Sequence, residues 1–408
     1  MDSAVILAAG EGTRLRPLTS TKPKPMLPVA GKPILEWDLL ALSAAGVKKV
    51  VIVVGYRKDK IIDYFGKKHS GVSIQYVEQK EQLGTGHATS LTREKIKGSV
   101  IVMNGDVLVS EKLIRQVISD FEKKKPAASM AVAEVSDPGK YGIIEVSNGY
   151  VTSLEEKPSR PKSKLANAGI YAFNQELYQN LKDVKKSKRL EYELTDAVKA
   201  LIKSGKVSAV VVKDTWIDVG LPWHLLDANE IMLKKMDLKV CKKAVIEDGA
   251  KLIGPVHVGD DTIIRSGCYI IGPVYIGEGC LVGPNCFIRP HTTIMNNCHI
   301  GTSVELKNDL IMSNSNVPHL SYVGDSILGE NVNIGAGTNI ANLRFDEAEV
   351  KVEIKNTLHG SGRRKFGALI GDNVKTGINV SIMPGRAVYP GAFVEAGSIV
   401  RNTIYTDL

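Results

Sequence analysis

Long hydrophobic runs are absent from this 408-residue sequence, in which no stretch of eighteen consecutive apolar residues occurs. A helix that crosses a membrane needs about twenty such residues, so we expect no membrane span and no membrane partner. The first three residues lead directly into an apolar run without a basic segment, which predicts that no secretory signal peptide is present. We therefore expect a cytoplasmic protein.

Interleaved basic and aromatic residues, which are typical of nucleic-acid-binding surfaces, are also missing. Lysine and arginine nevertheless outnumber aspartate and glutamate by 53 to 44, which gives a formal net charge of +9. Part of this excess lies in short clusters such as Lys123–Lys125, and these are typical of solvated helix ends and loops. A positive field also suits substrates that carry several phosphates. We expect small-molecule substrates and no nucleic acid.

The stretch from Val5 to Pro28 joins a strand pattern, a glycine turn and a group of basic residues. The apolar run Val5–Ala9 predicts a buried strand, which ends at Gly10-Glu11-Gly12. Backbone N–H groups in such a turn can bind an anion, because glycine lets the backbone approach a phosphate closely. The basic residues that follow, and that would add charge near a triphosphate, are Arg14, Arg16, Lys22 and Lys24.

Two common phosphate motifs do not fit this loop. No Gly-Lys-Ser/Thr follows it, so it is not a Walker loop, and Leu15 replaces the third glycine of a dinucleotide fingerprint. The spacing therefore predicts a phosphate site of another type, and a basic surface loop is the alternative.

Strand and helix patterns alternate after this loop. Strands are expected at 50–54, 74–77 and 100–103, and helices at 34–45, 58–65 and 113–124. Such alternation predicts an α/β, doubly wound (Rossmann-like) domain with a mostly parallel sheet. Ligands of such sheets bind beyond the carboxyl ends of the strands.

Two of these strand ends carry polar chemistry. The segment Glu81–His87 contains two glycines, which would allow the backbone to approach a flat ring closely. Asp106 follows the strand at 100–103, and a carboxylate is costly to bury without a partner. Mg²⁺ prefers one or two carboxylates together with phosphate oxygens and waters. We expect Asp106 to bind a metal, and a turn or N-cap role is the alternative.

The run GEGTRLRPLTSTKPKPMLPVAGKP, residues 10–33, resembles the signature of sugar-1-phosphate nucleotidylyltransferases. That family joins a nucleoside triphosphate to a sugar 1-phosphate and releases pyrophosphate. The resemblance implies that Arg14 and Lys24 are catalytic phosphate contacts, that Asp106 and Asp218 bind Mg²⁺, and that UTP or dTTP is a co-substrate. It implies a nucleotide site formed by Leu7, Ala8, Ala9, Gly10, Gly12, Thr13, Gln79, Gly84 and Thr85. It also implies a sugar-phosphate site formed by Gly142, Glu155, Glu156, Lys157, Asn167 and Thr195.

From residue 246 onward the hydrophobic period changes to six. The positions that follow this period are Ile246, Leu252, Val258, Ile264, Ile270, Ile276, Val282, Ile288, Ile294, Ile300, Leu306 and Met312. With its frequent glycines, this pattern predicts the hexapeptide repeat of a parallel β-helix, whose aliphatic residues point inward. We expect a nucleotidyltransferase domain at 1–222, a linker helix within 223–240 and the β-helix at 241–408. The phase breaks between 344 and 366, which predicts an inserted loop or hairpin.

Cysteine is scarce, and four of the five cysteines share one phase of the repeat. Cys268, Cys280, Cys286 and Cys298 each lie four residues after an inward aliphatic position, a phase also occupied by valines. We therefore predict that they are small core residues in a reducing compartment, and not disulfides or zinc ligands.

The segments 319–325 and 331–338, followed by Asn342, resemble the acetyltransferase half of a bifunctional family. This family combines N-acetylglucosamine-1-phosphate uridylyltransferase with glucosamine-1-phosphate acetyltransferase, and the resemblance is to its archaeal type. It implies a left-handed β-helix, a homotrimer and acetyl-CoA as a co-substrate. His319 would be the general base, since the ordinary histidine pKa of about 6.5 suits proton transfer from an amine. The implied sugar-phosphate contacts are Arg289, Lys307, Tyr322, Asn333 and Asn342, and the implied acetyl-CoA contacts are Ala336, Ile378, Ala396 and Arg401.

Several functions remain open on the sequence. Leu343 stands where bacterial members have an aromatic residue, so the choice between glucosamine and galactosamine phosphate is undecided. One alternative is a monofunctional glucose-1-phosphate thymidylyl- or uridylyltransferase whose β-helix serves trimerisation. A non-catalytic member, such as a translation exchange-factor subunit, would lack the phosphate and metal residues that are present here. A mannose-1-phosphate guanylyltransferase would leave His319 and its neighbours unexplained.

Overall fold

A computed structural model describes residues 1–187, 189–237 and 239–406. Contacts divide the chain into two compact units. The first contains Met1–Glu11, Pro23–Met26 and Ile34–Asp218, and the second contains Gly12–Lys22, Leu27–Pro33 and Val219–Leu408. Leu238 of the predicted linker and the last two residues of the predicted β-helix lie outside the described residues. No helix in the described part of the chain is long and apolar enough to cross a membrane.

A ten-stranded sheet forms the centre of the first unit, in the order β10-β11-β13-β9-β12-β7-β1-β4-β6-β5. Its strands β7 (Val100–Asn104), β1 (Ser3–Ala8), β4 (Lys49–Val54) and β6 (Val72–Glu78) are neighbours and parallel, and they contain the predicted apolar runs. The other strands are β5 (Lys68–His69), β9 (Ala128–Glu134), β10 (Gly142–Ser147), β11 (Tyr150–Glu156), β12 (Leu165–Phe173) and β13 (Val207–Val211).

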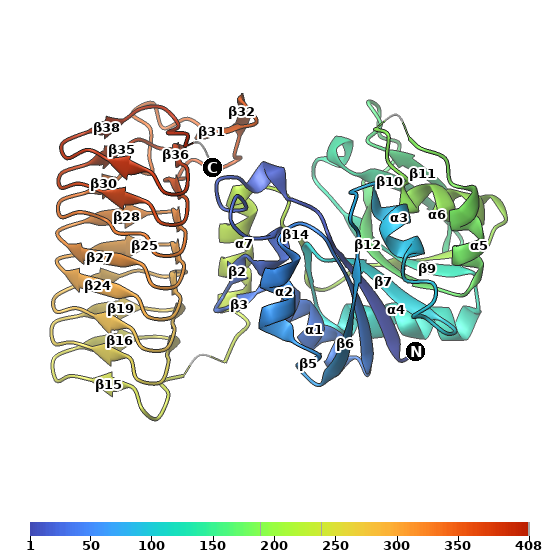
Figure 1. Ribbon diagram of the computed structural model, residues 1–408, viewed down its shortest axis with the longest axis horizontal. Coiled ribbons are helices and arrows are strands. Elements are labelled where there is room, and N and C mark those ends of the chain that lie inside the picture. The colour runs from blue at the N-terminus through green and yellow to red at the C-terminus, as the bar shows by residue number, and fades with distance from the viewer. Residues whose placement is uncertain (188, 238, 407–408) are drawn as a thin grey trace. The chain divides into compact units, whose positions relative to one another are not determined.

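The prediction of a mostly parallel sheet is confirmed only for the neighbouring strands β7, β1, β4 and β6. β12 pairs antiparallel with both β7 and β9, and β10 and β11 form an antiparallel pair. The reason is that the consecutive strands β9, β10, β11 and β12 are connected without a crossover α-helix, as antiparallel neighbours allow. β13, which follows α5 and α6, pairs parallel with β9. The Rossmann-like character of the first half is thereby confirmed, and the whole sheet is mixed (Figure 1).

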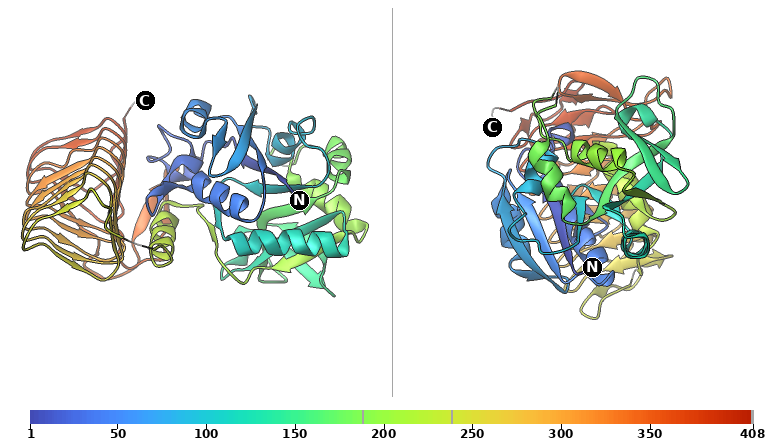
Figure 2. Two further views of the ribbon diagram at one scale, coloured as in Figure 1. Left: turned by 90° about the horizontal axis from the view of Figure 1, so that it is seen from below. Right: turned by 90° about the vertical axis from the view of Figure 1, so that its right-hand side faces the viewer.

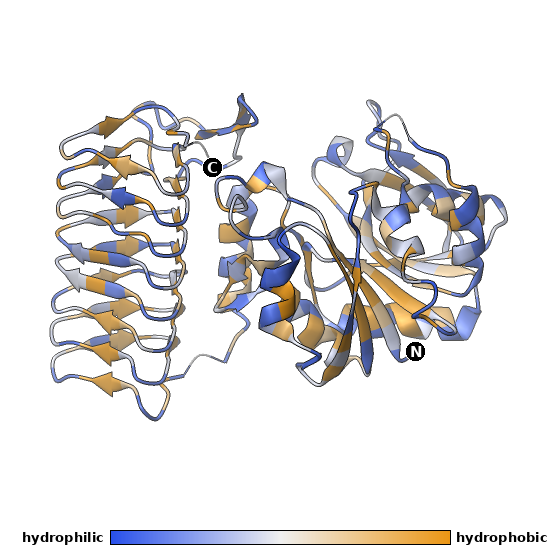
Figure 3. Cartoon of the chain, viewed as in Figure 1, coloured by the Kyte–Doolittle hydropathy of each residue, from blue (hydrophilic) through white to orange (hydrophobic). Residues whose placement is uncertain are grey.

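Helices cover both faces of this sheet. Alternate residues of the strands face two separate hydrophobic clusters, one with α1 (Ile34–Ala44), α2 (Lys58–Phe65) and α4 (Glu111–Lys124) and the other with α5 (Glu176–Asp183) and α6 (Leu194–Lys203). The central strands are therefore apolar over most of their length (Figure 3). The short helices are α3 (Thr85–Ser90), η2 (Lys24–Met26) and η3 (Pro138–Lys140).

The predicted helices in this unit are confirmed, with small shifts at their ends. Helix α4 begins before the predicted residue 113, because the Ser110 hydroxyl accepts a hydrogen bond from the Leu113 N–H and caps the helix at Ser110. The predicted linker helix within 223–240 is observed in the second unit as α7 (Pro222–Leu233), with proline in its first turn.

The second unit contains three long parallel sheets. Each strand pairs with the strand that lies one turn of the β-helix later in the chain, and we call each such turn a coil. The first holds β15 (Val245–Ile246), β18 (Ile263–Ile264), β21 (Leu281–Val282), β24 (His299–Thr302) and β27 (Asn316–His319). The second holds β16 (Lys251–Ile253), β19 (Tyr269–Ile271), β22 (Phe287–Ile288), β25 (Glu305–Lys307), β28 (Tyr322–Gly324), β30 (Asn339–Ile340), β35 (Ser381–Ile382) and β38 (Ile399–Val400). The third holds β17 (Val256–Val258), β20 (Val274–Ile276), β23 (Thr293–Ile294), β26 (Leu310–Ile311), β29 (Ile327–Leu328), β33 (Leu369–Ile370) and β36 (Ala387–Val388).

These sheets stack coil on coil, consistent with a parallel β-helix (Figures 1 and 2). Ile270 pairs with Ile288, which is 18 residues or three hexads later. Both are fully buried, as are the predicted inward residues from Val258 to Leu306, whereas Ile246 and Leu252 of the first coil are partly buried. The remaining strands are the parallel pair β34 (Lys375–Thr376) and β37 (Phe393–Val394) and the short hairpin of β2 (Pro28–Val29) and β3 (Lys32–Pro33).

The predicted inward position of Met312 is wrong. Ile294 pairs with Ile311, so this coil contains 17 residues instead of 18, and the phase moves back by one. Ile311 joins the hydrophobic core of the coil in its place. The next inward residues along the chain are Val317, Val323 and Leu328.

The predicted insertion is a hairpin. β31 (Lys351–Ile354) and β32 (Thr357–Gly360) pair antiparallel, and the coil resumes where Leu328 pairs with Ile370. The core role of the four cysteines is also confirmed. Cys268 and Cys286 belong to the core of the coil, with their sulfur atoms 3.3 Å apart on successive coils.

Candidate active sites

Three predicted residues from distant parts of the sequence meet in the first unit. Strands β8 (Val107–Val109) and β14 (Trp216–Asp218) pair antiparallel, and Asp218 lies opposite Val107, the residue directly after Asp106. Lys24 Nζ lies 2.7 Å from Asp106 Oδ2. Asp218 therefore ends β14, Asp106 directly precedes the paired strand β8, and the Lys24 amine contacts Asp106.

This donor set fits Mg²⁺ better than a metal that needs a complete protein cage. No group of three or more His, Cys, Asp or Glu able to hold a metal occurs among the described residues. Two carboxylates leave the other positions to phosphate oxygens and waters, which is how Mg²⁺ is usually bound. The Asp106 side chain is 35% exposed, whereas that of Lys24 is 8% exposed, so the acid remains accessible and the amine is held in place.

Asp38 is an acid near this site that the sequence reasoning missed. It lies on α1 with no exposed surface, and neither carboxyl oxygen has a hydrogen-bond partner among the described residues. Burial, and then the charge of Asp106, raises the pKa of Asp38 well above its ordinary value. The signal was available, since Asp38 falls at helical spacing among Leu35, Leu39 and Leu42 on the apolar face of the predicted helix.

The predicted nucleotide-binding strand ends lie close together. Leu7 of β1 accepts a hydrogen bond from the Gly105 N–H at 2.9 Å, so the end of this strand lies beside the turn that precedes Asp106. A Cβ atom on Gly105 would lie 3.0 Å from the Leu7 carbonyl oxygen, a distance tighter than ordinary packing. Ala8 and Ala9 follow Leu7 and are buried.

The predicted base-binding loop is held against residues 192–195. Gln79 is buried and donates to the Gly84 carbonyl oxygen at 3.0 Å. Gly84 has a φ of +98°, and a Cβ there would lie 2.6 Å from the Tyr192 carbonyl oxygen, so only glycine fits. The Thr85 hydroxyl accepts a hydrogen bond from the Leu194 N–H at 3.0 Å. The base loop and the segment that carries Thr195 are thus joined.

Three of the predicted sugar contacts also meet. Gly142 pairs with Glu156 across β10 and β11. A Cβ on Gly142 would lie 3.0 Å from Glu156 Oε2 and 3.7 Å from Asn167 Cβ. Asn167 is fixed by the Tyr171 hydroxyl at 2.6 Å and by the Gly169 N–H at 3.0 Å.

The other sugar-side predictions lie at the edges of this group. Glu155 and Lys157 flank Glu156 and are exposed. Arg189 was not identified by the motifs. Its Nη2 atom lies 2.7 Å from Glu193 Oε1 and 3.7 Å from Glu156 Oε1. A general run of basic residues was the only sequence signal for it.

The other part of the glycine loop belongs to the second unit. Gly12 has a φ of +65° and begins η1 (Thr13–Leu15), which contains Thr13 and Arg14. Lys22 was expected to add charge for a triphosphate, and this expectation is wrong. Its Nζ lies 2.7 Å from Glu330 and 3.2 Å from Asp372, and its side chain is 6% exposed. A buried cation needs such counter-ions, so Lys22 is already paired.

Three of the predicted acetyl-transfer residues, Lys307, Tyr322 and Asn342, form a cluster on the second sheet of the β-helix. Lys307 ends β25 and pairs with Gly324 of β28, the strand that contains Tyr322. Asn342 Nδ2 donates to the Tyr322 hydroxyl at 3.1 Å and to Asp325 Oδ2 at 2.5 Å. Lys307 Nζ lies 2.6 Å from the same Asp325 oxygen. Burial, and then the charges of Asp309, Asp325 and Glu305, raises the pKa of Tyr322 to about 12.

Arg289 lies one coil before this cluster. Its N–H donates to the Leu306 carbonyl oxygen, and its guanidinium lies 3.0 Å from Glu305 Oε1. Glu305 in turn pairs with Tyr322 across β25 and β28. A phosphate bound by Arg289 would therefore compete with Glu305 for the guanidinium.

His319 ends β27 and is exposed. Its carbonyl oxygen accepts hydrogen bonds from the Ser321 hydroxyl at 2.7 Å and from the Gly337 N–H at 3.4 Å, which fix the backbone. Asn333 lies one coil later, opposite Asn316 of β27. No hydrogen bond or ion pair among the described residues joins Asn333 to the cluster around Tyr322.

Three of the four predicted acetyl-CoA contacts, Ala336, Ile378 and Ala396, share one corner of successive coils. The Ala336 carbonyl oxygen accepts a hydrogen bond from the Asn379 N–H, and the Ile378 carbonyl oxygen accepts one from the Gly397 N–H, both at 2.8 Å. Ile378 and Ala396 are exposed there, and Arg401 follows β38.

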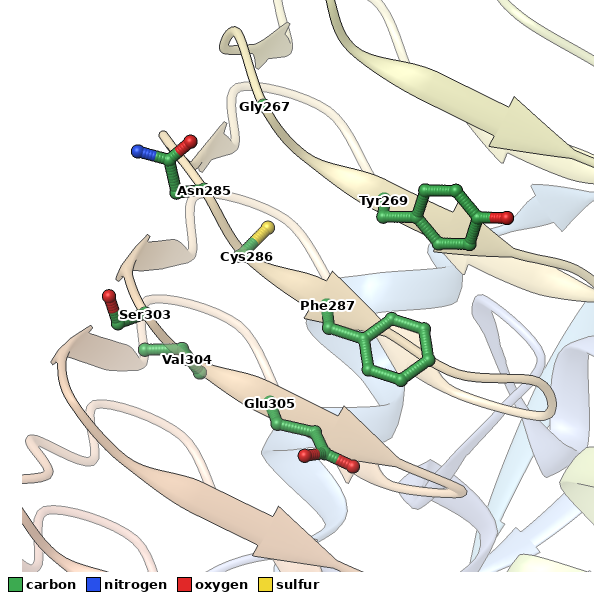
Figure 4. A pocket seen from close by; sticks show the side chains of 8 residues that line it. All are labelled: Gly267, Tyr269, Asn285, Cys286, Phe287, Ser303, Val304 and Glu305. Carbon is green, nitrogen blue, oxygen red and sulfur yellow. The ribbon is translucent and has the colours of Figure 1, made fainter.

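A shallow cavity of about 360 Å³ lies on the second sheet, on the coils before Tyr322. Figure 4 shows Tyr269, Phe287 and Glu305 projecting side by side from three successive strands. None of the predicted sugar-phosphate or acetyl-CoA residues lines this cavity. Glu305 connects it to Arg289.

Known proteins match both halves of the chain. Residues 3–235 match the family described as nucleotidyl transferase, and residues 270–362 match the GMPPB C-terminal domain. The solved structure of a UDP-glucose pyrophosphorylase complexed with UDP-glucose is 27% identical, has a TM-score of 0.53, and covers 58% of this chain and 100% of its own.

Two curated relatives match over nearly their whole length. The bifunctional protein GlmU of Methanocaldococcus jannaschii is 44% identical, over 99% of this chain and 96% of the relative. The bifunctional sugar-1-phosphate nucleotidylyltransferase/acetyltransferase of Sulfurisphaera tokodaii is 42% identical, over 96% of this chain and 97% of the relative. The resemblance inferred from the motifs is confirmed. The chain therefore belongs to the archaeal family of bifunctional nucleotidyltransferase/acetyltransferase enzymes.

Proposed function

We propose that this chain catalyses two consecutive steps of nucleotide-sugar synthesis. The β-helix acetylates glucosamine 1-phosphate, or galactosamine 1-phosphate, with acetyl-CoA. The first unit then transfers a uridylyl group from UTP, or a thymidylyl group from dTTP, to the N-acetylated sugar 1-phosphate and releases pyrophosphate. The observation that carries this proposal is the presence of two separate polar clusters, one around Asp106 and one around Tyr322.

In the nucleotidyl step, an oxygen of the sugar phosphate attacks the α-phosphorus of the nucleotide. A new P–O bond forms, and the bond to the pyrophosphate breaks. Lys24, fixed by Asp106, would stabilise the charge that develops on the phosphates, and we assign Arg14 the same role. Mg²⁺ held by Asp106 and Asp218 would supply further neutralising charge.

The other parts of the first unit would orient the two substrates. Gln79, Gly84 and Thr85 would hold the base, since the glycine backbone permits close approach to a flat ring. Gly142, Glu156 and Asn167 would contact the sugar, with Glu155, Lys157 and Thr195 around them. Such positioning supplies much of the rate of a reaction that needs no covalent enzyme intermediate.

In the acetyl step, the amine must lose a proton before it can attack the thioester carbonyl carbon. His319 would take that proton, a C–N bond would form, and the C–S bond would break with release of coenzyme A as a thiol. The exposed position of His319 makes it accessible to a substrate. Arg289, Lys307, Tyr322, Asn333 and Asn342 would hold the sugar phosphate, and Ala336, Ile378, Ala396 and Arg401 would line the acetyl-CoA groove.

We further propose that the coil is left-handed, that the domains divide at 222 and 240, and that the chain forms a homotrimer through the β-helix. In a trimer the residues at the corners of one coil face those of a neighbouring copy. This would bring Asn333, which no bond between described residues joins to the Tyr322 cluster, into the site of a neighbouring copy. Sedimentation of the purified chain tests the trimer, and a monomer would contradict it.

Two assays on the purified chain test the activities. Thiol release from acetyl-CoA, with glucosamine or galactosamine 1-phosphate as acceptor, tests the acetyl step. Mass spectrometry of the products, with a panel of nucleoside triphosphates and sugar 1-phosphates, tests the nucleotidyl step and identifies the base and sugar. Removal of divalent cations with EDTA should stop pyrophosphate release, and added Mg²⁺ should restore it. Pyrophosphate release without any thiol release would favour the monofunctional alternative.

A further inference from the structure

Asp325 is a buried carboxylate that the motifs did not assign to the site, although it contacts two of the predicted ligands. It is 2% exposed and follows β28. Its Oδ2 lies 2.6 Å from Lys307 Nζ and 2.5 Å from Asn342 Nδ2, and its Oδ1 accepts from Asn308 Nδ2 at 2.8 Å. Lys307, Asp325 and Asn342 come from three successive coils, so Asp325 ties these coils together at one corner.

The chemistry of a carboxylate decides how its neighbours are oriented. An ionised carboxylate only accepts hydrogen bonds, so the amide of Asn342 must turn its nitrogen toward Asp325. The same nitrogen donates to the Tyr322 hydroxyl at 3.1 Å. The Asn342 carbonyl oxygen is then the atom that this side chain can offer to a substrate.

The same network sets the roles of the other two side chains. The Tyr322 oxygen accepts from Asn342, so its own hydrogen is available to donate. Lys307 has three N–H donors and directs one of them to Asp325. The cluster thus presents an ammonium donor, a hydroxyl donor and an amide acceptor, a set that complements a phosphate monoester and a sugar hydroxyl.

A second acid at the same corner shows a different pattern. Asp309 is fully buried, and its carboxylate accepts from the backbone N–H of Lys307 at 2.7 Å and of Ser326 at 2.8 Å. These bonds hold the turn and touch no ligand side chain. The Asp325 carboxylate instead bonds side chains, two of which are predicted to bind the sugar phosphate.

We propose that Asp325 is a positioning residue of the acetyl-transfer site, which orients Lys307, Asn342 and, through Asn342, Tyr322 toward the amino-sugar 1-phosphate. This inference rests on the proposed acetyl-transfer function. Asp325 contacts the substrate only through these side chains, and acetyl-CoA binding is independent of it.

The experiment is steady-state acetylation by the full-length chain with Asp325→Asn, with each substrate varied in turn and inorganic phosphate as a competitive inhibitor. An asparagine at this position can turn either amide atom to Asn342, so the orientation is lost. We expect kcat/KM for the amino-sugar phosphate to fall by about 10- to 100-fold, because small displacements of positioning groups have effects of this order. The inhibition constant of phosphate should rise, the KM of acetyl-CoA should change less than about twofold, and pyrophosphate release should be unchanged.

Thr262→Val is the matched structural control. Thr262 is fully buried in the same β-helix, and its hydroxyl bonds the Gly277 carbonyl oxygen at 2.7 Å and the Cys280 N–H at 2.9 Å. This variant should lose thermal stability with the KM values of both substrates unchanged. If Asp325→Asn does not fold, Asn308→Gly decides the question, since it removes one bond to Asp325 at a φ of +55° that glycine tolerates. It should raise the KM of the amino-sugar phosphate in the same direction by a smaller factor.

The outcomes distinguish the positioning role of Asp325 from the acetyl-transfer function of the chain. An active wild type together with an equally active Asp325→Asn overturns the role of Asp325 alone. A variant whose KM values for both substrates rise together also overturns it, because that pattern indicates a general loss of structure. A wild-type chain without thiol release overturns the acetyl-transfer function itself.

Discussion

Replacing Asp106 with asparagine tests the centre of the nucleotidyl-transfer site. Asp106 Oδ2 accepts a hydrogen bond from Lys24 Nζ at 2.7 Å. Asp106 also directly precedes Val107, which pairs with Asp218 across β8 and β14. Asparagine keeps the size of the side chain and one oxygen, but it removes the negative charge. The variant therefore loses the proposed metal ligand and the counter-ion of Lys24 together.

The magnitude follows from these two contacts. Removing one group that stabilises transition-state charge costs about 3 kcal/mol. That free energy corresponds to a roughly 150-fold lower rate at 25 °C. Because Asp106→Asn would weaken two such groups, the proposed Mg²⁺ and Lys24, we expect kcat for pyrophosphate release to fall by at least about 100-fold. The free energy of unfolding should fall by about 1 to 3 kcal/mol, since the Lys24 amine, 8% exposed, loses its charged partner.

The assay is pyrophosphate release at saturating Mg²⁺, with thiol release from acetyl-CoA measured on the same preparation. The acetyl step is the internal control, since none of its predicted residues lies in the first unit. Unchanged thiol release shows that the second unit of the variant is folded and active. Retention of more than about a tenth of the wild-type kcat for pyrophosphate release would refute the assignment of Asp106.

Three further outcomes are expected. His319→Ala should lower thiol release by about 10²- to 10⁴-fold and leave pyrophosphate release unchanged; equal thiol release in the variant would exclude His319 as the base. Ile288→Ala, at a fully buried position, should lower the free energy of unfolding by about 2 to 5 kcal/mol in a denaturant titration. Ile253 is 43% exposed, so Ile253→Ala should change this free energy much less. Equal losses of unfolding free energy in the two variants would contradict the inward position of Ile288. Burial raises the pKa of Asp309 well above the ordinary value of about 3.9. The free energy that protonated Asp309 contributes to folding is therefore complete below about pH 4, and it is lost as pH rises through the folded-state pKa. Tm should therefore fall less with rising pH in Asp309→Asn than in the wild type, and parallel curves would show that Asp309 has no such role.

The two halves of the chain differ in how far their fold could be predicted. In the β-helix, a period of six places each inward residue by counting along the chain, as Ile270 and Ile288 show. The prediction failed at Met312 because one residue fewer is present in that coil. Aliphatic residues occupy both 311 and 312, so the count alone could not reveal the missing residue.

In the first unit, local patterns predicted individual elements but not their pairing. The apolar runs of β1, β4 and β7 were correctly predicted as strands. The antiparallel pairs of β12 with β7 and β9 were not predicted, because strand order depends on contacts between segments far apart in the sequence. The signature motif likewise predicted Lys24 but could not show that Lys22, two residues before it, pairs with Glu330 and Asp372.

The sequence by itself determined the family, the existence of two chemistries and the inward residues of most coils, because motifs and short periods are local properties of a chain. Only the tertiary structure decided which side chains meet. It placed Asp218 beside Asp106, left Asp38 buried with no hydrogen-bond partner among the described residues, and centred Lys307 and Asn342 on Asp325. The physical reason is that a contact between distant residues depends on how the whole chain closes on itself, and a carboxylate shows its role only through the donors that surround it.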